Sequence, residues 1–140
     1  MDSIAKASVT VNAPARKVWT ALVTPEIVKQ YMAGATVASD WSPGSPITWK
    51  GEWKGKPFED KGVILAAEPG RRLQYTHFSP ASGQPDRPEN YHTVTVELAE
   101  QGGHTTVSLT QDKNPTEEAR RHSEENWEMM LDGLKKAVEG

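Results

Sequence analysis

Two histidines and a tyrosine are the residues of this sequence whose types and spacing best suit chemistry. His77 and His92 flank a long polar segment, and Tyr75 lies two residues before the first histidine. Imidazole gains and loses a proton near neutral pH, so it serves as an acid, a base or a polar contact. The three side chains are therefore candidates for acid–base catalysis, as in a cyclase or hydrolase, or for anchoring a bound molecule.

The histidine pair lacks the partners that a metal site or a covalent mechanism needs. Zinc takes three or four protein ligands, and no spacing supplies a third one, although Glu52, Glu59 or Asp60 could approach. The chain has no cysteine, which removes thiol catalysis and Cys-based zinc sites. Neither a Gly-x-Ser-x-Gly turn nor a phosphate-binding or dinucleotide motif occurs. We therefore assign no metal, no cofactor and no catalytic residue.

Aromatic residues form a second group with a chemical use. Trp41, Trp49 and Trp53 fall within thirteen residues, and Trp49 and Trp53 share one face of a strand. Such rings stack on flat ligands, and they also pack the core of a sheet. We favour packing, with Trp49 as a wall of a binding site.

Strands make up most of the middle of the chain. Apolar residues alternate from Ala5 to Val11, which predicts a half-buried strand. Further strands are predicted around Val37 and at 47–53, 62–67, 72–78, 94–98 and 105–111. Gly102-Gly103 is the strongest hairpin signal. Residues 79–90 contain three prolines and little to bury, and they predict a long loop.

Proline positions indicate where the helices begin. Asn12 and Pro14 predict the start of one short helix, and Pro25 the start of another that runs through Tyr31. A long C-terminal helix is predicted with Asn114 as cap, Pro115 in first position and Glu117 as the capping-box acid. Its apolar face consists of Ala119, Ser123, Trp127, Met130, Leu134 and Ala137 or Val138.

The strands around the long loop can be placed in register. A two-residue turn at Gly102-Gly103 pairs Leu98 with Val107, and Phe78 opposite Tyr91 pairs His77 with His92. The same register places Tyr75 opposite Val94 and Leu73 opposite Val96, so the inner residues face the helix that carries Trp127 and Met130. The predicted ligand-binding residues are Tyr75, His77, His92, Val94, Val96, Trp127, Met130 and Trp49, with Leu98 as a further wall. Loop 79–90 would control access.

Composition and length limit the classes of protein. A chain of 140 residues supports one core, and we expect residues 1–140 to form a single domain. Its net charge of −3 with dispersed basic residues argues against nucleic-acid binding. No apolar run reaches the roughly 20 residues of a membrane span, and the N-terminus has no signal-peptide pattern. We therefore expect a cytoplasmic protein without a membrane partner.

The core is lean in aliphatic residues. Leu, Ile, Val and Phe make up 24 of the 140 residues, about 17%, whereas five Trp and three Tyr supply large rings. Together with the small strand residues Ala5, Ala7, Ala66 and Ala67, this composition predicts a thin or hollow core near His77 and His92.

Several segments resemble the family of activator of heat-shock-protein-90 ATPase homologues, within the START-like (SRPBCC) superfamily. The resemblance rests on 11–22, 62–76, 93–98 with 102–107, and Trp127 with Leu131 and Leu134. It implies an α+β helix-grip fold: a curved antiparallel sheet of about six to seven strands around a long C-terminal helix, with two short helices after the first strand. Such folds often enclose a hydrophobic ligand cavity.

Three functions remain open at this point. The first, which we favour, is a START-like domain that binds a hydrophobic or aromatic small molecule between sheet and helix. The second is a co-chaperone-like module that stimulates a heat-shock-protein-90 ATPase in a stress response, with the chaperone as partner. The third is a cyclase- or hydrolase-like enzyme that uses the histidine pair. A monomer and a homodimer are both compatible with the sequence, and a fold alone does not decide function.

Overall fold

A computed structural model describes residues 4–80 and 83–140, except for the side chain of Trp53. In chain order the elements are β1 (Ala5–Val11), α1 (Ala15–Val23), α2 (Pro25–Tyr31), β2 (Thr36–Ser39), β3 (Pro46–Trp53), β4 (Lys56–Glu68), β5 (Arg72–His77), a short 3₁₀ helix (Pro88–Asn90), β6 (His92–Gln101), β7 (His104–Gln111) and α3 (Glu117–Glu139).

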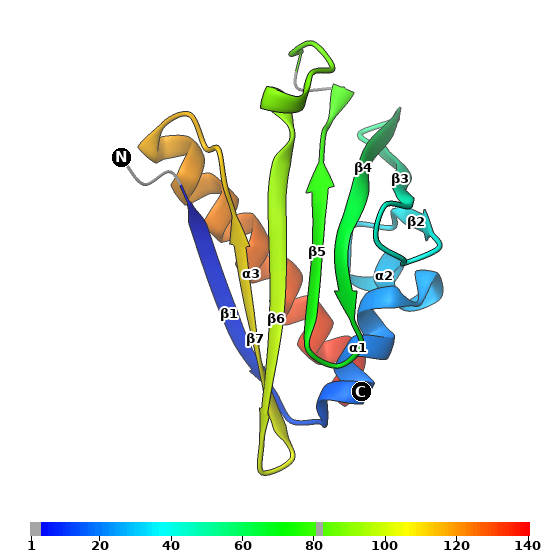
Figure 1. Ribbon diagram of the computed structural model, residues 1–140, viewed down its shortest axis with the longest axis vertical. Coiled ribbons are helices and arrows are strands. Elements are labelled where there is room, and N and C mark those ends of the chain that lie inside the picture. The colour runs from blue at the N-terminus through cyan, green and yellow to red at the C-terminus, as the bar shows by residue number, and fades with distance from the viewer. Residues whose placement is uncertain (1–3, 81–82) are drawn as a thin grey trace.

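The strands form one curved, antiparallel, seven-stranded sheet (Figure 1). Their order is β1-β7-β6-β5-β4-β3-β2. Every pair of adjacent strands except β1 and β7 is therefore also consecutive in the sequence. Tight turns join β3 to β4, β4 to β5 and β6 to β7, whereas longer connections join β2 to β3 and β5 to β6. All of these pairs are antiparallel, as is usual for strands that follow one another directly in the chain.

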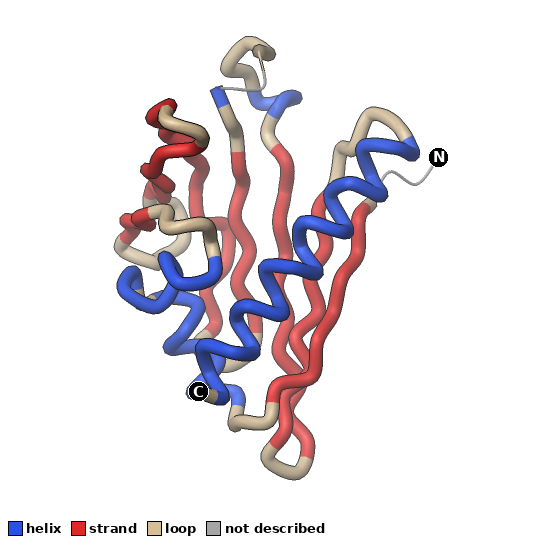
Figure 2. Tube along the Cα trace, turned by 180° about the vertical axis from the view of Figure 1, so that it is seen from behind, coloured by secondary structure: helices blue, strands red, loops and turns tan. Residues whose placement is uncertain are grey.

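All three α-helices lie on one face of the sheet. Helix α3 runs diagonally across that face, with α1 and α2 beside its C-terminal half (Figure 2). It packs on β1 along one side and on α2 along the other. This is the predicted α+β helix-grip arrangement. Among the described residues, none of the helices combines the length and apolar character that crossing a bilayer requires.

The predicted register of the central strands is confirmed. His77 pairs with His92, Tyr75 with Val94 and Leu73 with Val96. Across the Gly102-Gly103 turn, Leu98 pairs with Val107, Val96 with Leu109 and Val94 with Gln111. Phe78 and Tyr91 follow at the loop end of this pair of strands, with their rings stacked 5.1 Å apart.

The prediction for β4 was too short. The strand begins at Lys56 rather than near Gly62, and it pairs with β3 from Trp53–Lys56 onward. Lys54 and Gly55 form the tight turn, both with positive φ. A two-residue turn of this kind matches the twist of the strands. A lysine in its first position is uncommon, so the sequence gives only a weak signal for this turn.

The predicted starts of two helices also need correction. The cap of α3 is Thr116, whose hydroxyl accepts a hydrogen bond from the Ala119 backbone N–H, so the helix begins two residues after Pro115. Asn114 is instead buried, and its side-chain amide donates to the carbonyl of Gln111. Pro14 occupies the cap position of α1 in place of Asn12 and makes no side-chain cap.

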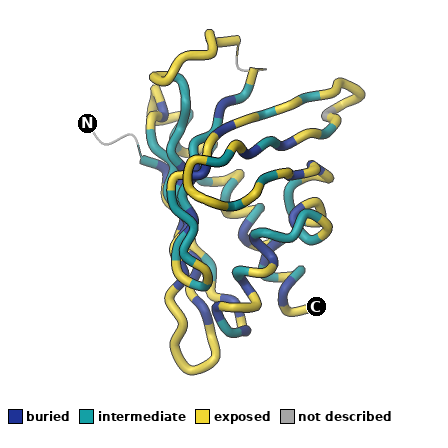
Figure 3. The backbone as a smooth tube through the Cα atoms, turned by 45° about the vertical axis from the view of Figure 1, so that its right-hand side comes forward, coloured by how far each residue is buried: buried dark blue, intermediate teal, exposed yellow. Residues whose placement is uncertain are grey.

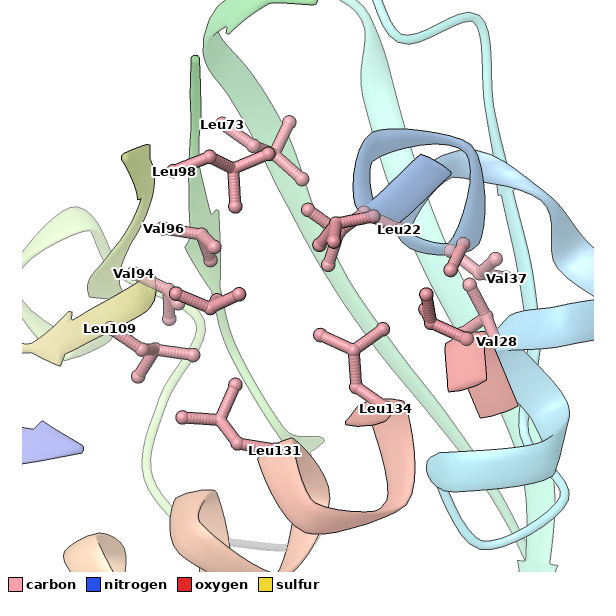
Figure 4. Packing of buried hydrophobic residues seen from close by; sticks show 14 of the residues in the cluster. Leu22, Val28, Val37, Leu73, Val94, Val96, Leu98, Leu109, Leu131 and Leu134 are labelled. Carbon is pink, nitrogen blue, oxygen red and sulfur yellow. The ribbon is translucent and has the colours of Figure 1, made fainter. Parts of the chain in front are cut away.

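Buried residues concentrate between α3 and the sheet, whereas the β6–β7 hairpin tip is exposed (Figure 3). Leu131 and Leu134 of α3 point toward Val94, Val96 and Leu109 of the sheet (Figure 4). Apolar side chains of α1 and α2, which lie beside α3, complete the same cluster. This packing holds α3 firmly over β6 and β7.

Candidate ligand-binding pocket

A pocket of about 470 Å³ opens between α3 and the half of the sheet formed by β3, β4 and β5. Its floor comes from these strands, its sides from α2 and α3, and part of its rim from the segment after α2. The lining residues are Tyr31, Met32, Ala33, Ala35, Trp49, Phe58, Asp60, Tyr75, His77, Gln111, Ser123, Asn126, Trp127, Met129 and Met130.

The floor is an aromatic surface. The rings of Trp49 and Tyr75 lie 5.2 Å apart at 48°, and those of Trp49 and His77 lie 5.1 Å apart in an edge-to-face arrangement. Strand alternation explains the grouping, because Tyr75 and His77 are two residues apart on β5. Tilted and edge-to-face pairs fix the rings without filling the space above them.

The opposite wall belongs to α3. Trp127 and Met130 are one helical turn apart and line the same pocket. The indole N–H of Trp127 donates to the side-chain oxygen of Gln111 on β7 at 2.5 Å. That hydrogen bond fixes the indole while its ring lines the pocket.

The polar end of the pocket is an aspartate–histidine pair. Nε2 of His77 lies 2.9 Å from Oδ2 of Asp60, and because a carboxylate oxygen accepts, the imidazole N–H donates. The side chains are 30% and 18% exposed. The second oxygen, Oδ1, is buried and has no hydrogen-bond partner among the residues that the structure describes.

Strand pairing brings Asp60 to this position. Asp60 faces Trp49 across the β3–β4 ladder. The bridge between Lys61 and Phe78 places Asp60 and His77 on the opposite face of their strands, toward the helices. The sequence suggested Asp60 only as one of three acids, since 56–61 was not recognised as a strand.

The hydroxyl groups of the two tyrosines of the pocket remain protonated at neutral pH. Burial raises the pKa of both Tyr31 and Tyr75 well above the usual value of 10.0, and for Tyr31 the neighbouring Tyr75 adds to the shift. The Tyr31 hydroxyl donates to the carbonyl of Ala21 at 2.8 Å. Tyr31 therefore acts as a packing residue, as predicted, while its ring also lines the pocket.

A second, deeper cavity of about 30 Å³ lies beneath the pocket. Tyr31, Met32, Trp49, Tyr75 and Met130 border both spaces. The remaining lining is apolar: Leu22, Val28, Val37, Trp41, Ile47, Leu73 and Val96. The volume corresponds to about one or two waters, and the mostly apolar lining offers a water few hydrogen-bond partners.

The structure brings most of the predicted site residues together. Trp49, Tyr75, His77, Trp127 and Met130 line the pocket. Val96 borders the deeper cavity, and Val94 is fully buried in the core below.

His92 lies apart from this group. Its Nδ1–H donates to the backbone carbonyl of Asp112 at 2.9 Å. It lines a neighbouring polar pocket of about 360 Å³ together with His77, Ser79, Gln84, Glu89, Asn90, Lys113 and Pro115. Four residues of loop 79–90 border this neighbouring pocket: Ser79, Gln84, Glu89 and Asn90. The rim of the main pocket is formed by the segment after α2 and by α3.

A curved antiparallel sheet that grips a long helix, with a pocket between the two, defines a START-like domain. The family model described as activator of Hsp90 ATPase homolog 1-like protein matches residues 12–139. The chain belongs to this family. No curated protein matches the sequence.

Solved structures agree with this assignment. A protein of Cytophaga hutchinsonii, solved in solution, is 57% identical over 97% of this chain and 93% of its own, with a TM-score of 0.85. The Aha1 dimer from Colwellia psychrerythraea is 19% identical over 97% and 96%, with a TM-score of 0.75. Ara h 8.0201 is 16% identical over 96% of each chain, with a TM-score of 0.71. The last two share the fold.

Proposed function

We propose that the protein binds a hydrophobic or aromatic small molecule in the pocket between β3–β5 and α3. The observation that carries this proposal is the pocket itself, in which Trp49, Tyr75 and Trp127 form apolar walls and Asp60 with His77 forms one polar end. Small-molecule sites are typically concave and apolar, with few polar groups and volumes of roughly 300–1,000 Å³. The pocket fits that description.

The binding proposal is tested with a neutral aromatic probe, 4-phenyl-1-butanol. We expect the probe to raise the melting temperature of the protein and to give saturable heat in isothermal titration calorimetry. Trp127→Ala removes one aromatic wall, so it should weaken probe affinity about tenfold or more. The control is Glu128→Ala, an exposed neighbour on α3 that does not line the pocket.

Native mass spectrometry of freshly purified protein provides an independent measurement. A retained small molecule that is lost in Trp127→Ala would support the proposal. Absence of a retained molecule, combined with failure of this probe and of its amine and carboxylate analogues to bind, would overturn it.

Family membership favours a second candidate, a co-chaperone-like module that stimulates a heat-shock-protein-90 ATPase. Such a module acts through its surface, so chaperone stimulation should persist in Trp127→Ala, whereas a ligand-dependent function should not. An ATPase assay with purified chaperone separates the two candidates.

An enzyme is the third candidate, and the pair formed by His77 and Asp60 is the observation in its favour. A carboxylate that orients an imidazole is a common arrangement in acid–base catalysis. Any turnover should then depend on His77 rather than on a pair formed by His77 and His92, because His92 lies in the neighbouring pocket.

Three further proposals concern the domain organisation, location and oligomeric state of the protein. We propose that the chain acts as one START-like domain in the cytoplasm. The dimer of Colwellia psychrerythraea Aha1 supports a homodimer as an alternative to a monomer.

A further inference from the structure

The polar end of the pocket carries a single acidic side chain. Among its described lining residues, Asp60 is the one acidic side chain, and none is a lysine or an arginine. The basic Lys61 lies next to Asp60 in sequence, but it faces the other side of the sheet and pairs with Asp86. A ligand in this pocket therefore meets a single negative group among aromatic walls.

The carboxylate of Asp60 is only half satisfied. Oδ2 accepts a hydrogen bond from His77, whereas the buried Oδ1 has no partner among the described residues. A buried acceptor without a donor destabilises the empty pocket, and a charged acceptor does so most strongly. Asp60 lines the pocket and part of its side chain is exposed there, so a donor in the pocket can approach the carboxylate.

The ring beside this carboxylate suits a cation as well. Trp49 pairs with Asp60 across the β3–β4 ladder, and its ring also contacts Tyr75. A cation held by Asp60 would lie close to these aromatic rings, and electron-rich ring faces attract cations, most strongly where water is excluded.

We propose that the natural ligand is an amphipathic amine, whose ammonium group donates to Asp60 while its apolar body occupies the space between Tyr75 and Trp127. This inference rests on the proposed binding function and adds the charge class of the ligand. A carboxylate ligand would be repelled by Asp60, and a neutral ligand would gain less from that end of the pocket.

The test compares three probes with the same phenylbutyl body: 4-phenylbutylamine, 4-phenyl-1-butanol and 4-phenylbutyrate. In isothermal titration calorimetry on the full chain, we expect the amine to bind about tenfold more tightly than the alcohol, because a hydrogen bond to a charged group exceeds one to a neutral group. The butyrate should bind more weakly than the alcohol. Added salt should reduce the advantage of the amine.

A matched pair of variants assigns the preference to one carboxylate. Asp60→Asn should reduce the ratio of amine to alcohol affinity to about one. Glu59→Gln removes the same charge one residue away, from an exposed position on the outer face, and should leave the ratio unchanged. Thermal unfolding of both variants verifies that they are folded, and if Asp60→Asn is not, the wild-type ratio and its salt dependence decide.

The outcomes separate this inference from the binding proposal. Equal affinity for all three probes, tighter binding of the butyrate, or a preference that persists in Asp60→Asn would overturn the ammonium inference and leave the binding function standing. Failure of all three probes to bind, with no small molecule retained in native mass spectrometry, would overturn both.

Discussion

Asp86 holds the long connection between β5 and β6 against the sheet. Its carboxylate pairs with the Lys61 ammonium and accepts a hydrogen bond from the Tyr91 hydroxyl at 2.6 Å. The ring of Tyr91 stacks on Phe78, so Asp86 is linked to β4 through Lys61 and, through Tyr91, to the ends of the connection next to β5 and β6. The hydrogen bonds from Lys61 and then Tyr91 hold the pKa of Asp86 below its usual value of 3.8.

This lowered pKa predicts an acid-dependent loosening of the loop. A group with a lower pKa in the folded state stabilises that state above its unfolded pKa and ceases to do so as pH falls through the folded pKa. Asp86→Asn should therefore speed amide hydrogen exchange in 83–90 at pH 5–8, and the difference from wild type should shrink as pH falls below about 3.8 and vanish below the still lower folded pKa. The effect should be small, because an exposed ion pair contributes little.

The control is Asp40→Asn, which removes a carboxylate of the β2–β3 connection. At the alkaline end, the raised pKa of Lys61 implies that its contribution is complete below 10.5 and declines as pH rises above that value. A difference between Asp86→Asn and wild type that grew on acidification would contradict this account.

At the scale of single residues, the sequence predicted the site in part. Alternation of side chains was enough to place Tyr75 and His77 on the inner face, and helical spacing was enough to bring Trp127 and Met130 toward it. The role of Asp60 could not be predicted, since it depends on the pairing of β4 with both of its neighbours. A contact between three strands is a property of the folded sheet and leaves no local pattern.

Among the elements, α1 begins without a capping side chain of its own. Pro14 stands at its cap, and a carboxylate distant in the sequence compensates: Oε1 of Glu100, on β6, accepts a hydrogen bond from the Ala15 backbone N–H at 2.7 Å. A negative group at a helix N-terminus also interacts favourably with the helix dipole. The β6–β7 hairpin thus fixes the start of α1.

Loss of this contact should therefore destabilise the protein although Glu100 is exposed. We expect Glu100→Ala to lower the free energy of unfolding by about 1 kcal/mol, the usual cost of removing a helix cap. Chemical denaturation followed by circular dichroism measures the change. Glu97→Ala, an exposed glutamate on the same strand, is the matched control, and equal effects of the two substitutions would refute a capping role.

Elements were predicted most accurately where local signals agree with the fold. The predictions of a hairpin at Gly102-Gly103 and of a helix that begins at Pro25 were both correct. The start of α3 was displaced because Asn114-Pro115 is a strong local helix signal, whereas Asn114 is used in the core, where it also accepts a hydrogen bond from Ser123. Tertiary demand for a buried amide outweighed local preference at this point.

At the scale of the whole molecule, the lean aliphatic content corresponds to uneven packing. Helix α3 packs closely on β1 and on α2, while the space between α3 and β3–β5 contains the main pocket with a small cavity beneath it. The two sides of the pocket are connected at one end by the contact of α2 with α3. We therefore expect that contact to set how far the pocket opens.

Gly133 lies at the centre of the contact between the helices. A Cβ at this position would lie 2.8 Å from the Cβ of Tyr31 and 3.4 Å from its Cα, closer than side chains normally approach. Glycine in a helix is unfavourable relative to alanine by about 1 kcal/mol, so its presence in α3 has a packing reason. Tyr31 lines both the pocket and the deeper cavity, and any shift of α2 changes both spaces.

Gly133→Ala should consequently destabilise the protein in spite of its better helix propensity. Overpacking costs about 1–3 kcal/mol, which exceeds the propensity gain, so we expect a net loss of about 1 kcal/mol in chemical denaturation. Because α2 must move away from α3, the affinity for 4-phenyl-1-butanol should change as well, whereas Glu128→Ala on the exposed face of the same helix should affect neither quantity. A Gly133→Ala protein with higher stability and unaltered probe affinity would show that the contact between α2 and α3 does not control the pocket.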